Sequence, residues 1–470
     1  MRRVFQCVMV FAIIVTLIMA SRTPANAQAG KMPLKHIIVV YMENWSFDAL
    51  YGTFPGANGL ANATDAAPQV DKTGKVYDVL PAPLNSNKKD SNGKSVADDR
   101  FPANLPNKPF EIDKYVPTTD VTGDLVHRYY QEQYQIDGGK MDKFVAWSDA
   151  AGLVMGYDDI TKLPMYQYAK QYTLEDNFFH GAFGGSFLNH FFLVCACAPT
   201  FPNAPTDAVV QLDANGAMTK DGSVTPDGFV VNTSFSSFTP HPSNVKPDHL
   251  VPPQTLPTIG DRLSDKSISW AWYSGGWNDA IAGKPDKLFQ FHHQPFAFFK
   301  NYGDDTDARK QHLKDETDFY AALSDGSLPA VSFVKPIGAN NEHPGYAALA
   351  TGEMWLAKLV DTVQKSPEWQ DSAIIITYDE HGGQWDHVAP PKVDKWGPGT
   401  RVPALVISPY AKKGFVDHTQ MDTTSILAFI EYQYGLQPLG DRDTKAANMT
   451  SAFDFSQTPS AATMSATSAQ

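Results

Sequence analysis

Two apolar segments, far apart in the sequence, each run into a pair of adjacent side chains that can bind a metal ion. The segment HIIVVYM precedes Glu43 and Asn44, and the segment AIIITY precedes Asp379 and Glu380. If the two segments end side by side, three carboxylates meet, and they would repel one another and resist ionisation. A bound cation is the simplest way to hold them together. All four side chains offer hard oxygen ligands, which favour calcium, magnesium or manganese over zinc.

A glycine-rich turn leads into a possible nucleophile. Gly184 and Gly185 precede Ser186, and the apolar run FLNHFFLV that follows predicts a helix. Free backbone N–H groups at a helix start suit a phosphoryl oxyanion, and glycine lets the backbone approach a ligand closely. Taken alone, the pattern fits an ordinary helix cap equally well. Next to a bound cation, however, a serine hydroxyl loses its proton more readily, so Ser186 becomes a candidate nucleophile.

Histidines recur in polar stretches of the sequence. They include His127, the adjacent pair His292 and His293, His343 and His387. A single histidine is more often structural than functional, but an adjacent pair and positions near predicted strand ends favour a site. Histidines there would donate hydrogen bonds to phosphoryl oxygens and protonate a leaving alkoxide. The sequence does not single out which of them is the acid.

The elements that must position these side chains follow from hydrophobic patterning. The two apolar segments are continuous rather than alternating, which predicts buried parallel strands. Further strands are predicted at 268–273, 330–334 and 404–408, and helices at 125–135, 314–323, 351–364 and 424–434. This alternation predicts an α/β fold with a mostly parallel sheet and helices on both faces. Ligands of such sheets bind beyond the carboxyl ends of the strands, which is where the candidate residues lie.

Two polar stretches, 55–122 and 198–257, interrupt the pattern and are expected to be long loop insertions that wall the site. No clean domain boundary is visible, so we expect one catalytic domain over 28–455. The Ser-, Ala- and Thr-rich stretch 456–470 predicts a disordered tail. Cys195 and Cys197 lie beside an apolar run, which favours two buried thiols over a local disulfide.

Residues 1–27 have the pattern of an export signal. Arg2 and Arg3 precede an apolar stretch, and Ala25-Asn26-Ala27 fits a cleavage site. The alternative, an uncleaved membrane anchor, is disfavoured because the apolar stretch is short of the ~20 residues that a span needs. We therefore expect a periplasmic or secreted protein without a transmembrane segment in the mature chain. Cleavage would lower the formal charge from −13 to −16, which disfavours a nucleic-acid scaffold.

Six motifs resemble those of one known family. They are MENWSFD (42–48), GGKMD (138–142), EHPGY (342–346), YDEHGG (378–383), DHVAPP (386–391) and RVPALVISPY (401–410). In this order, and over about 36 to 440, they resemble the bacterial phosphoesterase family that includes phospholipases C and respiratory-burst-inhibiting acid phosphatases.

The resemblance implies an alkaline-phosphatase-like α/β fold and a phosphoric ester hydrolase. It implies that one divalent metal ion is held by Glu43, Asn44, Asp379 and Glu380 together with the nucleophile Ser186. It also implies that the phosphate site is lined by His127, His292, His293 and His343.

One departure helps to separate the two branches of the family. The phospholipase C branch usually has threonine as nucleophile, followed by Asn-Pro-Asn-Arg, whereas here Ser186 is followed by Phe-Leu-Asn-His, which is closer to the acid phosphatases. We therefore expect an exported acid phosphatase that forms a phosphoserine intermediate. A phospholipase C that cleaves choline phospholipids is the alternative.

Two other functions fit the sequence less well. A sulfatase is disfavoured because Phe201 stands where the formylglycine signature, partly imitated by Cys197-Ala198-Pro199-Thr200, needs arginine. A phosphate- or metal-binding protein without turnover would use the same carboxylates, but it would leave Ser186 and the histidines without a role.

Overall fold

The computed structural model describes residues 31–460. The predicted export signal therefore lies outside the described residues, as does most of the predicted tail. The first residues of that tail are held against the domain, since the Ser460 N–H donates to the carbonyl of Pro409 (2.9 Å) and Gln457 Nε2 to that of Ala411 (3.0 Å). Within 31–460, no helix is both long and apolar enough to cross a membrane.

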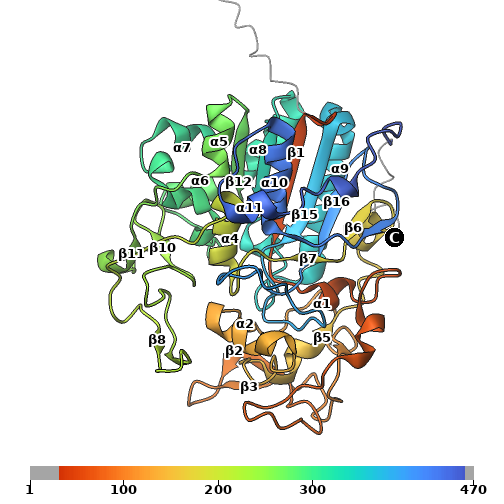
Figure 1. Cartoon of the computed structure of the whole chain (residues 1–470), viewed down its shortest axis with the longest axis vertical. Coiled ribbons are helices and arrows are strands. Elements are labelled where there is room, and N and C mark those ends of the chain that lie inside the picture. The colour runs from red at the N-terminus through yellow and green to blue at the C-terminus, as the bar shows by residue number, and fades with distance from the viewer. Residues whose placement is uncertain (1–30, 461–470) are drawn as a thin grey trace, which may run out of the picture.

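The centre of the molecule is an eight-stranded sheet with the order β13-β12-β14-β1-β15-β16-β6-β17 (Figure 1). Its strands are β1 (His36–Met42), β6 (Thr173–Glu175), β12 (Trp270–Ser274), β13 (Leu313–Asp315), β14 (Val331–Lys335), β15 (Ser372–Tyr378), β16 (Ala404–Ile407) and β17 (Phe415–Asp417). The central strand β1 pairs in parallel with β14 and β15, and β16 runs antiparallel to β15 and β6. The predicted mostly parallel α/β sheet is confirmed.

Helices cover the sheet because its central strands are buried along their whole length. Every residue of β15 is buried, so both of its faces must be covered. The main helices are α4 (Ser186–Cys195), α8 (Glu316–Asp325), α9 (Leu349–Lys365) and α10 (Thr423–Tyr434), with α4 against α10 and α8 against α9. Shorter helices are α1 (Phe47–Tyr51), α3 (Pro164–Ala169), α5 (Ile259–Asp265), α6 (Trp277–Ile281), α7 (Asp307–His312) and α11 (Asp441–Lys445).

One helix begins later than the sequence pattern predicts. Helix α2 (Tyr129–Ile136) starts four positions after the expected 125, and the preceding residues stay extended. The Val126 N–H donates to Asp149 Oδ1 (2.8 Å), and His127 Nδ1 lies 2.5 Å from the Leu125 carbonyl oxygen. These contacts hold His127 outside the helix, where its ring reaches the site.

The first insertion, 55–122, lies beyond the carboxyl ends of the central strands (Figure 1). Together with residues up to about 155 it buries a small hydrophobic cluster of its own, which includes Leu80, Phe110 and Phe144. Its strands are β2 (Leu84–Lys89), β3 (Ser95–Ala97) and β4 (Phe110–Glu111), and β4 pairs with β5 (Gly156–Tyr157). The insertion is therefore a packed cap rather than a loose loop.

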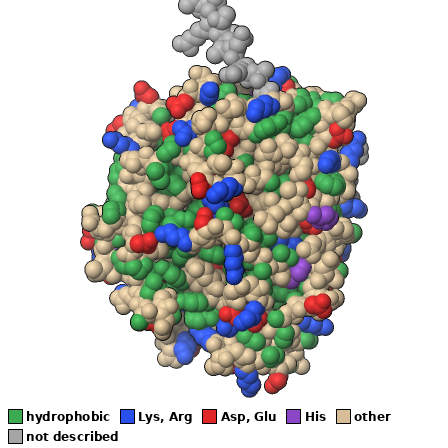
Figure 2. All heavy atoms as spheres, viewed as in Figure 1, with side chains coloured by type: hydrophobic (Ala, Val, Ile, Leu, Met, Phe, Trp, Pro, Cys, Tyr) green, Lys and Arg blue, Asp and Glu red, His purple; other side chains and the backbone are tan. Residues whose placement is uncertain are grey.

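The second insertion, 198–257, is made of short ladders. They are β8 (Gln211–Leu212) with β9 (Met218–Lys220), and β10 (Phe235–Ser236) with β11 (Leu250–Val251); elsewhere β7 (Phe178–Phe179) pairs with β18 (Met421–Asp422). On the face shown in Figure 2, acidic and basic side chains are interspersed.

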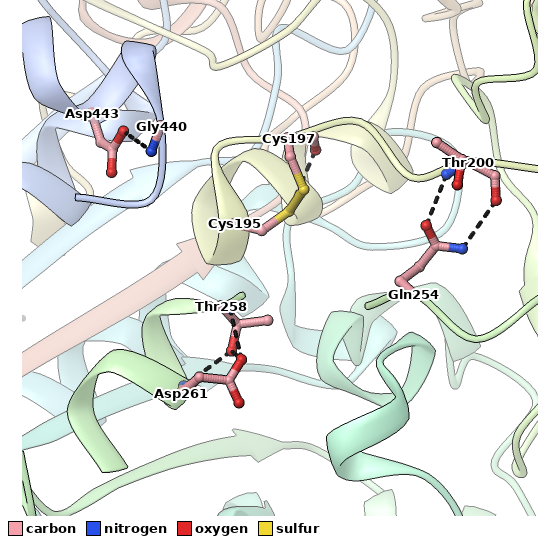
Figure 3. Close-up of a disulfide and its surroundings, with 8 residues drawn as sticks. All are labelled: Cys195, Cys197, Thr200, Gln254, Thr258, Asp261, Gly440 and Asp443. Carbon is pink, nitrogen blue, oxygen red and sulfur yellow. Dashed lines mark hydrogen bonds between the residues drawn. A yellow bond between two sulfur atoms is a disulfide. The ribbon is translucent and has the colours of Figure 1, made fainter. Parts of the chain in front are cut away.

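Cys195 and Cys197 form a disulfide, so the expectation of two buried thiols was wrong (Figure 3). Helix α4 ends at Cys195, and Ala196 adopts a left-handed backbone conformation with φ 49°. That turn brings the Cα atoms of Cys195 and Cys197 to 5.1 Å, within the range that a disulfide spans. The bridge closes the carboxyl end of the helix that begins at Ser186.

Candidate active site

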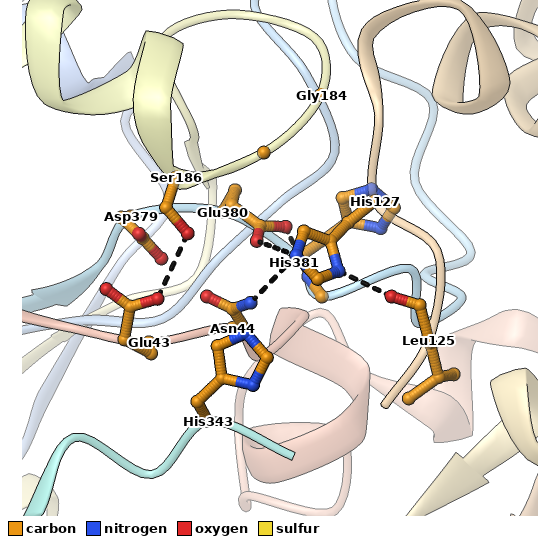
Figure 4. Close-up of polar contacts among 12 residues, drawn as sticks. Glu43, Asn44, Leu125, His127, Gly184, Ser186, His343, Asp379, Glu380 and His381 are labelled. Atoms are coloured by element: carbon orange, nitrogen blue, oxygen red, sulfur yellow. Dashed lines mark hydrogen bonds and ion pairs between the residues drawn. The ribbon is translucent and has the colours of Figure 1, made fainter. Parts of the chain in front are cut away.

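Four oxygen-bearing side chains meet at the carboxyl ends of β1 and β15. These strands pair in register through Met42 and Tyr378, so the residues that follow them emerge side by side. Figure 4 shows Glu43, Asn44, Asp379 and Glu380 gathered at this edge. All four are fully buried. The structure thus brings together the predicted metal ligands from segments more than three hundred residues apart.

Ser186 faces this group from the start of α4. Gly185 is the residue before the helix, Ser186 is its first residue, and the Ser186 hydroxyl donates to Glu43 Oε2 at 3.0 Å. Gly184 has φ 91°, and a Cβ there would lie 2.5 Å from the backbone nitrogen of Tyr129. Only glycine fits this turn, which delivers the serine to the carboxylates.

Two buried side chains hold the turn before Ser186, and the sequence prediction included neither. Glu132 Oε2 accepts the Gly184 N–H at 2.5 Å, and its Oε1 accepts the Thr400 N–H at 2.8 Å and lies 3.0 Å from His180 Nε2. Asn189 Oδ1 accepts the Ala182 N–H at 2.9 Å. Burial alone would raise the pKa of Glu132, but its histidine neighbours and the Gly184 N–H hold that pKa down to about 2. The turn is thus anchored to an ionised carboxylate.

Four of the five predicted histidines border the same site. His293 Nε2 lies 3.0 Å from Glu43 Oε1, and the His292 ring lies 4.5 Å from the His293 ring. His127 Nε2 lies 3.7 Å from Glu380 Oε1, and the His343 ring lies 5.5 Å from the His127 ring.

Burial separates the roles that these histidines can play. It lowers the pKa of His292 and of His343 to about 4, so both are neutral near pH 7. His127 is less buried, with 18% of its side chain exposed. His387 lies elsewhere, with Nδ1 2.6 Å from Asp48 Oδ2 in a buried ion network with Arg401.

Two further residues of the site were absent from the sequence prediction. Lys335 is the last residue of β14, and its Nζ forms an ion pair with Glu43 Oε1 and lies 3.9 Å from Asp379 Oδ2. His190 lies one turn along α4 from Ser186, with Nδ1 2.7 Å from the Ser186 carbonyl oxygen and 3.7 Å from Asp379 Oδ2. Lys335 could have been found from the sequence, because it directly follows the predicted strand 330–334, as the candidate metal ligands follow theirs.

The donor set fits a divalent metal ion. Asn44 Oδ1, Glu380 Oε1 and both carboxylate oxygens of Asp379 are buried and accept no hydrogen bond from any residue in 31–460. Burial, and then the neighbouring carboxylates, raise the pKa of Asp379 and of Glu380 well above the usual range. A hard cation would coordinate these oxygens and restore their ionised form.

A cavity of about 360 Å³ opens beside His127 and Gly185. Polar and charged residues make up most of its lining: Ser86, Asn87, Lys89, Asp124, Arg128, Asp149, Asn232 and Thr233, with Leu125 and Val126 as the apolar members. The cavity therefore offers a polar space next to the turn before Ser186.

Comparison with known proteins decides the class of chemistry. The sequence model of the Phosphoesterase family matches residues 34–437, which is most of the chain. The chain belongs to the Phosphoesterase family. It is therefore a phosphoric ester hydrolase, as the motifs predicted.

Several proteins that are similar to this chain are named phospholipases C. Phospholipase C B of Mycobacterium tuberculosis is 24% identical over 91% of this chain and 78% of its own length. The non-hemolytic phospholipase C of Pseudomonas aeruginosa is 24% identical over 92% of this chain, which spans 59% of that relative. A solved structure of an alkaline phosphatase superfamily protein from Vibrio parahaemolyticus is 14% identical over 70% of this chain and 72% of its own, with a TM-score of 0.33.

Proposed function

We propose that this phosphoesterase is a metal-dependent acid phosphatase that hydrolyses phosphate monoesters through a phosphoserine at Ser186. The observation that carries the proposal is the Ser186 hydroxyl, 3.0 Å from Glu43 Oε2 at the edge of four buried oxygen ligands and at the start of a ten-residue helix. The proposed ligands Glu43, Asn44, Ser186, Asp379 and Glu380 would hold one divalent ion, with calcium, magnesium or manganese favoured by the hard donors. Such an ion lowers the pKa of a bound hydroxyl and neutralises charge on phosphoryl oxygens.

The residues of the chain supply the remaining steps. The Ser186 oxygen attacks phosphorus and passes its proton along the existing hydrogen bond to Glu43 Oε2. The ester P–O bond breaks, and the leaving alkoxide takes a proton from His127. His127 suits this role because its Nδ1 is held at the Leu125 carbonyl while Nε2 points to the site, and because the polar cavity lies beside it. Water then attacks the phosphoserine and gives a proton to His127, and phosphate leaves as the Ser186 oxygen takes its proton back from Glu43.

The cavity favours a monoester with a polar alcohol over a choline phospholipid. In a phospholipase C reaction the leaving group is diacylglycerol, which needs an apolar surface next to the nucleophile. The cavity beside Gly185 and His127 instead presents Lys89, Asp124 and Asp149. Phospholipase C activity remains the second candidate, because the relatives carry that name at 24% identity.

One comparison of substrates tests the proposal. The purified protein is assayed for phosphate release from glycerol phosphate and for phosphocholine release from phosphatidylcholine vesicles, with and without a chelator. We expect the monoester to be hydrolysed at least tenfold more efficiently and the chelator to abolish the reaction. Faster release of phosphocholine would overturn the phosphatase proposal in favour of a phospholipase C.

We also propose that the mature chain is a single catalytic domain that begins near Gln28 and is exported to the periplasm or the medium. The support is the sequence pattern of residues 1–27. N-terminal sequencing of the protein recovered from periplasm and medium tests this, and retention of Arg2 and Arg3 would contradict it.

A further inference from the structure

A buried lysine lies among the proposed metal ligands. We propose that the Lys335 ammonium takes the place of a second metal ion, so that the centre binds a single divalent ion and is held together by one fixed and one exchangeable cation. This inference rests on the metal site of the proposed function.

The geometry places Lys335 inside the carboxylate group. The side chain is fully buried at the carboxyl end of β14, next to β1 in the sheet. Its Nζ forms an ion pair with Glu43 Oε1, lies 3.9 Å from Asp379 Oδ2 and lies 3.4 Å from the Met42 carbonyl oxygen. All three contacts are with β1, β15 or the residues that directly follow them. The ammonium is therefore fixed by the same strand ends that position the ligands.

Lys335 also lies against a second group of potential metal ligands. Glu43, His190 and His293 are buried, and their ligand atoms all lie within 4.8 Å of one another. His293 Nε2 lies 3.0 Å from Glu43 Oε1. The same oxygen forms the ion pair with Lys335. The His190 and His293 rings stack at a centroid distance of 4.9 Å, which closes this side of Glu43. A second ion at this group would have to share Oε1 with the ammonium.

The charges agree with one ion. When Glu43, Asp379 and Glu380 are all ionised they carry three negative charges, and Lys335 with one divalent ion supplies three positive charges. A second divalent ion would leave an uncompensated excess of positive charge in a fully buried site, which is costly. The lysine thus limits the number of ions as well as stabilising the carboxylates.

Lys335→Met keeps the length of the side chain and removes its charge. We expect the folded variant to bind Mn²⁺ at least tenfold more tightly than wild type in calorimetry of the metal-free protein, because a like charge beside the ion is gone. We expect its turnover to fall at least tenfold at saturating Mn²⁺, because Glu43 loses its fixed partner. A purely structural role would weaken both properties together. Lys365→Met is the matched control, since that lysine is 68% exposed, and it should change neither.

The number of ions in the wild-type protein is the second measurement, by native mass spectrometry at saturating Mn²⁺. One ion per chain is expected, and two would overturn the inference whatever the variants do. Unchanged or weaker Mn²⁺ binding by a Lys335→Met protein with a native melting transition would also overturn it. If that variant does not fold, Lys335→Gln is measured in the same way. A wild-type protein that binds no ion would instead overturn the metal site of the proposed function.

Discussion

The Ser186 hydroxyl donates to Glu43 Oε2 at 3.0 Å across 143 residues of sequence, joining the start of α4 to the end of β1. The parallel register of β1 and β15 fixes the carboxylates, and the glycine turn before α4 fixes the hydroxyl.

Asp379→Asn should weaken Mn²⁺ binding at least tenfold and yet stabilise the metal-free protein. The buried carboxyl has a strongly raised pKa, first from burial and then from Glu43, so a neutral amide fits the metal-free site better. Calorimetric titration and thermal melting in chelator measure the two effects. Asp441→Asn, at a 95% exposed side chain, is the control and should alter neither. Lower stability of the metal-free variant would contradict this account of the carboxylates.

Glu132→Gln should lower kcat ~10–100-fold with little change in KM or in Mn²⁺ affinity. The amide keeps the volume of the side chain but cannot accept the Gly184 and Thr400 N–H groups together, so the turn before Ser186 loosens. Gln133→Ala is the matched control, because this neighbouring side chain donates to the Tyr129 carbonyl of its own helix and does not reach the turn before Ser186. Equal kinetics in the two variants would show that Glu132 does not position the nucleophile.

His127→Gln should slow glycerol phosphate hydrolysis by ~10²-fold or more while affecting p-nitrophenyl phosphate much less. A nitrophenolate leaves without a proton, whereas an alkoxide requires an acid, and His127 borders the cavity that we propose receives the alcohol. Steady-state rates with both substrates measure the ratio. His249→Gln, near the surface, should leave it unchanged. Equal losses on both substrates would assign the leaving-group proton to another residue.

Much of this site could be predicted from the sequence because its strands are continuous apolar runs. Such runs are buried on both faces, and the side chains after them must meet at one edge of a parallel sheet. Glu43, Asn44, Asp379 and Glu380 follow directly from that rule. Ser186 follows from the turn chemistry of Gly184 and Gly185 only when it is combined with the predicted cation site.

The features that the sequence analysis missed are placed by tertiary structure. A lysine after an apolar run, such as Lys335, ordinarily points to solvent, and only the pairing of β14 with β1 places it against Glu43. Glu132 lies in an amphipathic helical pattern, where a carboxylate is usually exposed. The disulfide depends on the left-handed backbone of Ala196, which the sequence does not reveal.

Asp158→Asn should make the stability of the protein less dependent on pH. Burial, followed by the charges of Asp113 and Glu111, raises the pKa of Asp158 from 3.8 to about 8. The folded protein therefore keeps a proton that the unfolded chain releases, and the free energy of unfolding falls as pH rises from about 4 through about 8. Below about pH 4, Asp158 is protonated in both the folded and the unfolded state, so it no longer changes the free energy of unfolding.

Denaturant titrations at pH 5 and pH 8 measure this effect. From pH 5 to pH 8, the free energy of unfolding of the wild type should fall by ~2–4 kcal/mol more than that of the asparagine variant. Asp441→Asn, whose carboxylate is exposed, should show the wild-type dependence. A loss of the same size in Asp158→Asn would contradict the assignment of the proton to Asp158.

Trapping the covalent intermediate tests the central claim most directly. The enzyme is mixed with substrate, quenched in acid within milliseconds, digested and sequenced by mass spectrometry, with Ser186→Ala as control and Ser327→Ala, at an exposed serine, as the matched variant. We predict one phosphoryl group on Ser186 in wild type and in Ser327→Ala, and neither phosphoserine nor turnover in a folded Ser186→Ala protein. Near-normal phosphatase activity in Ser186→Ala, or a phosphoryl group on any other residue, would contradict the account.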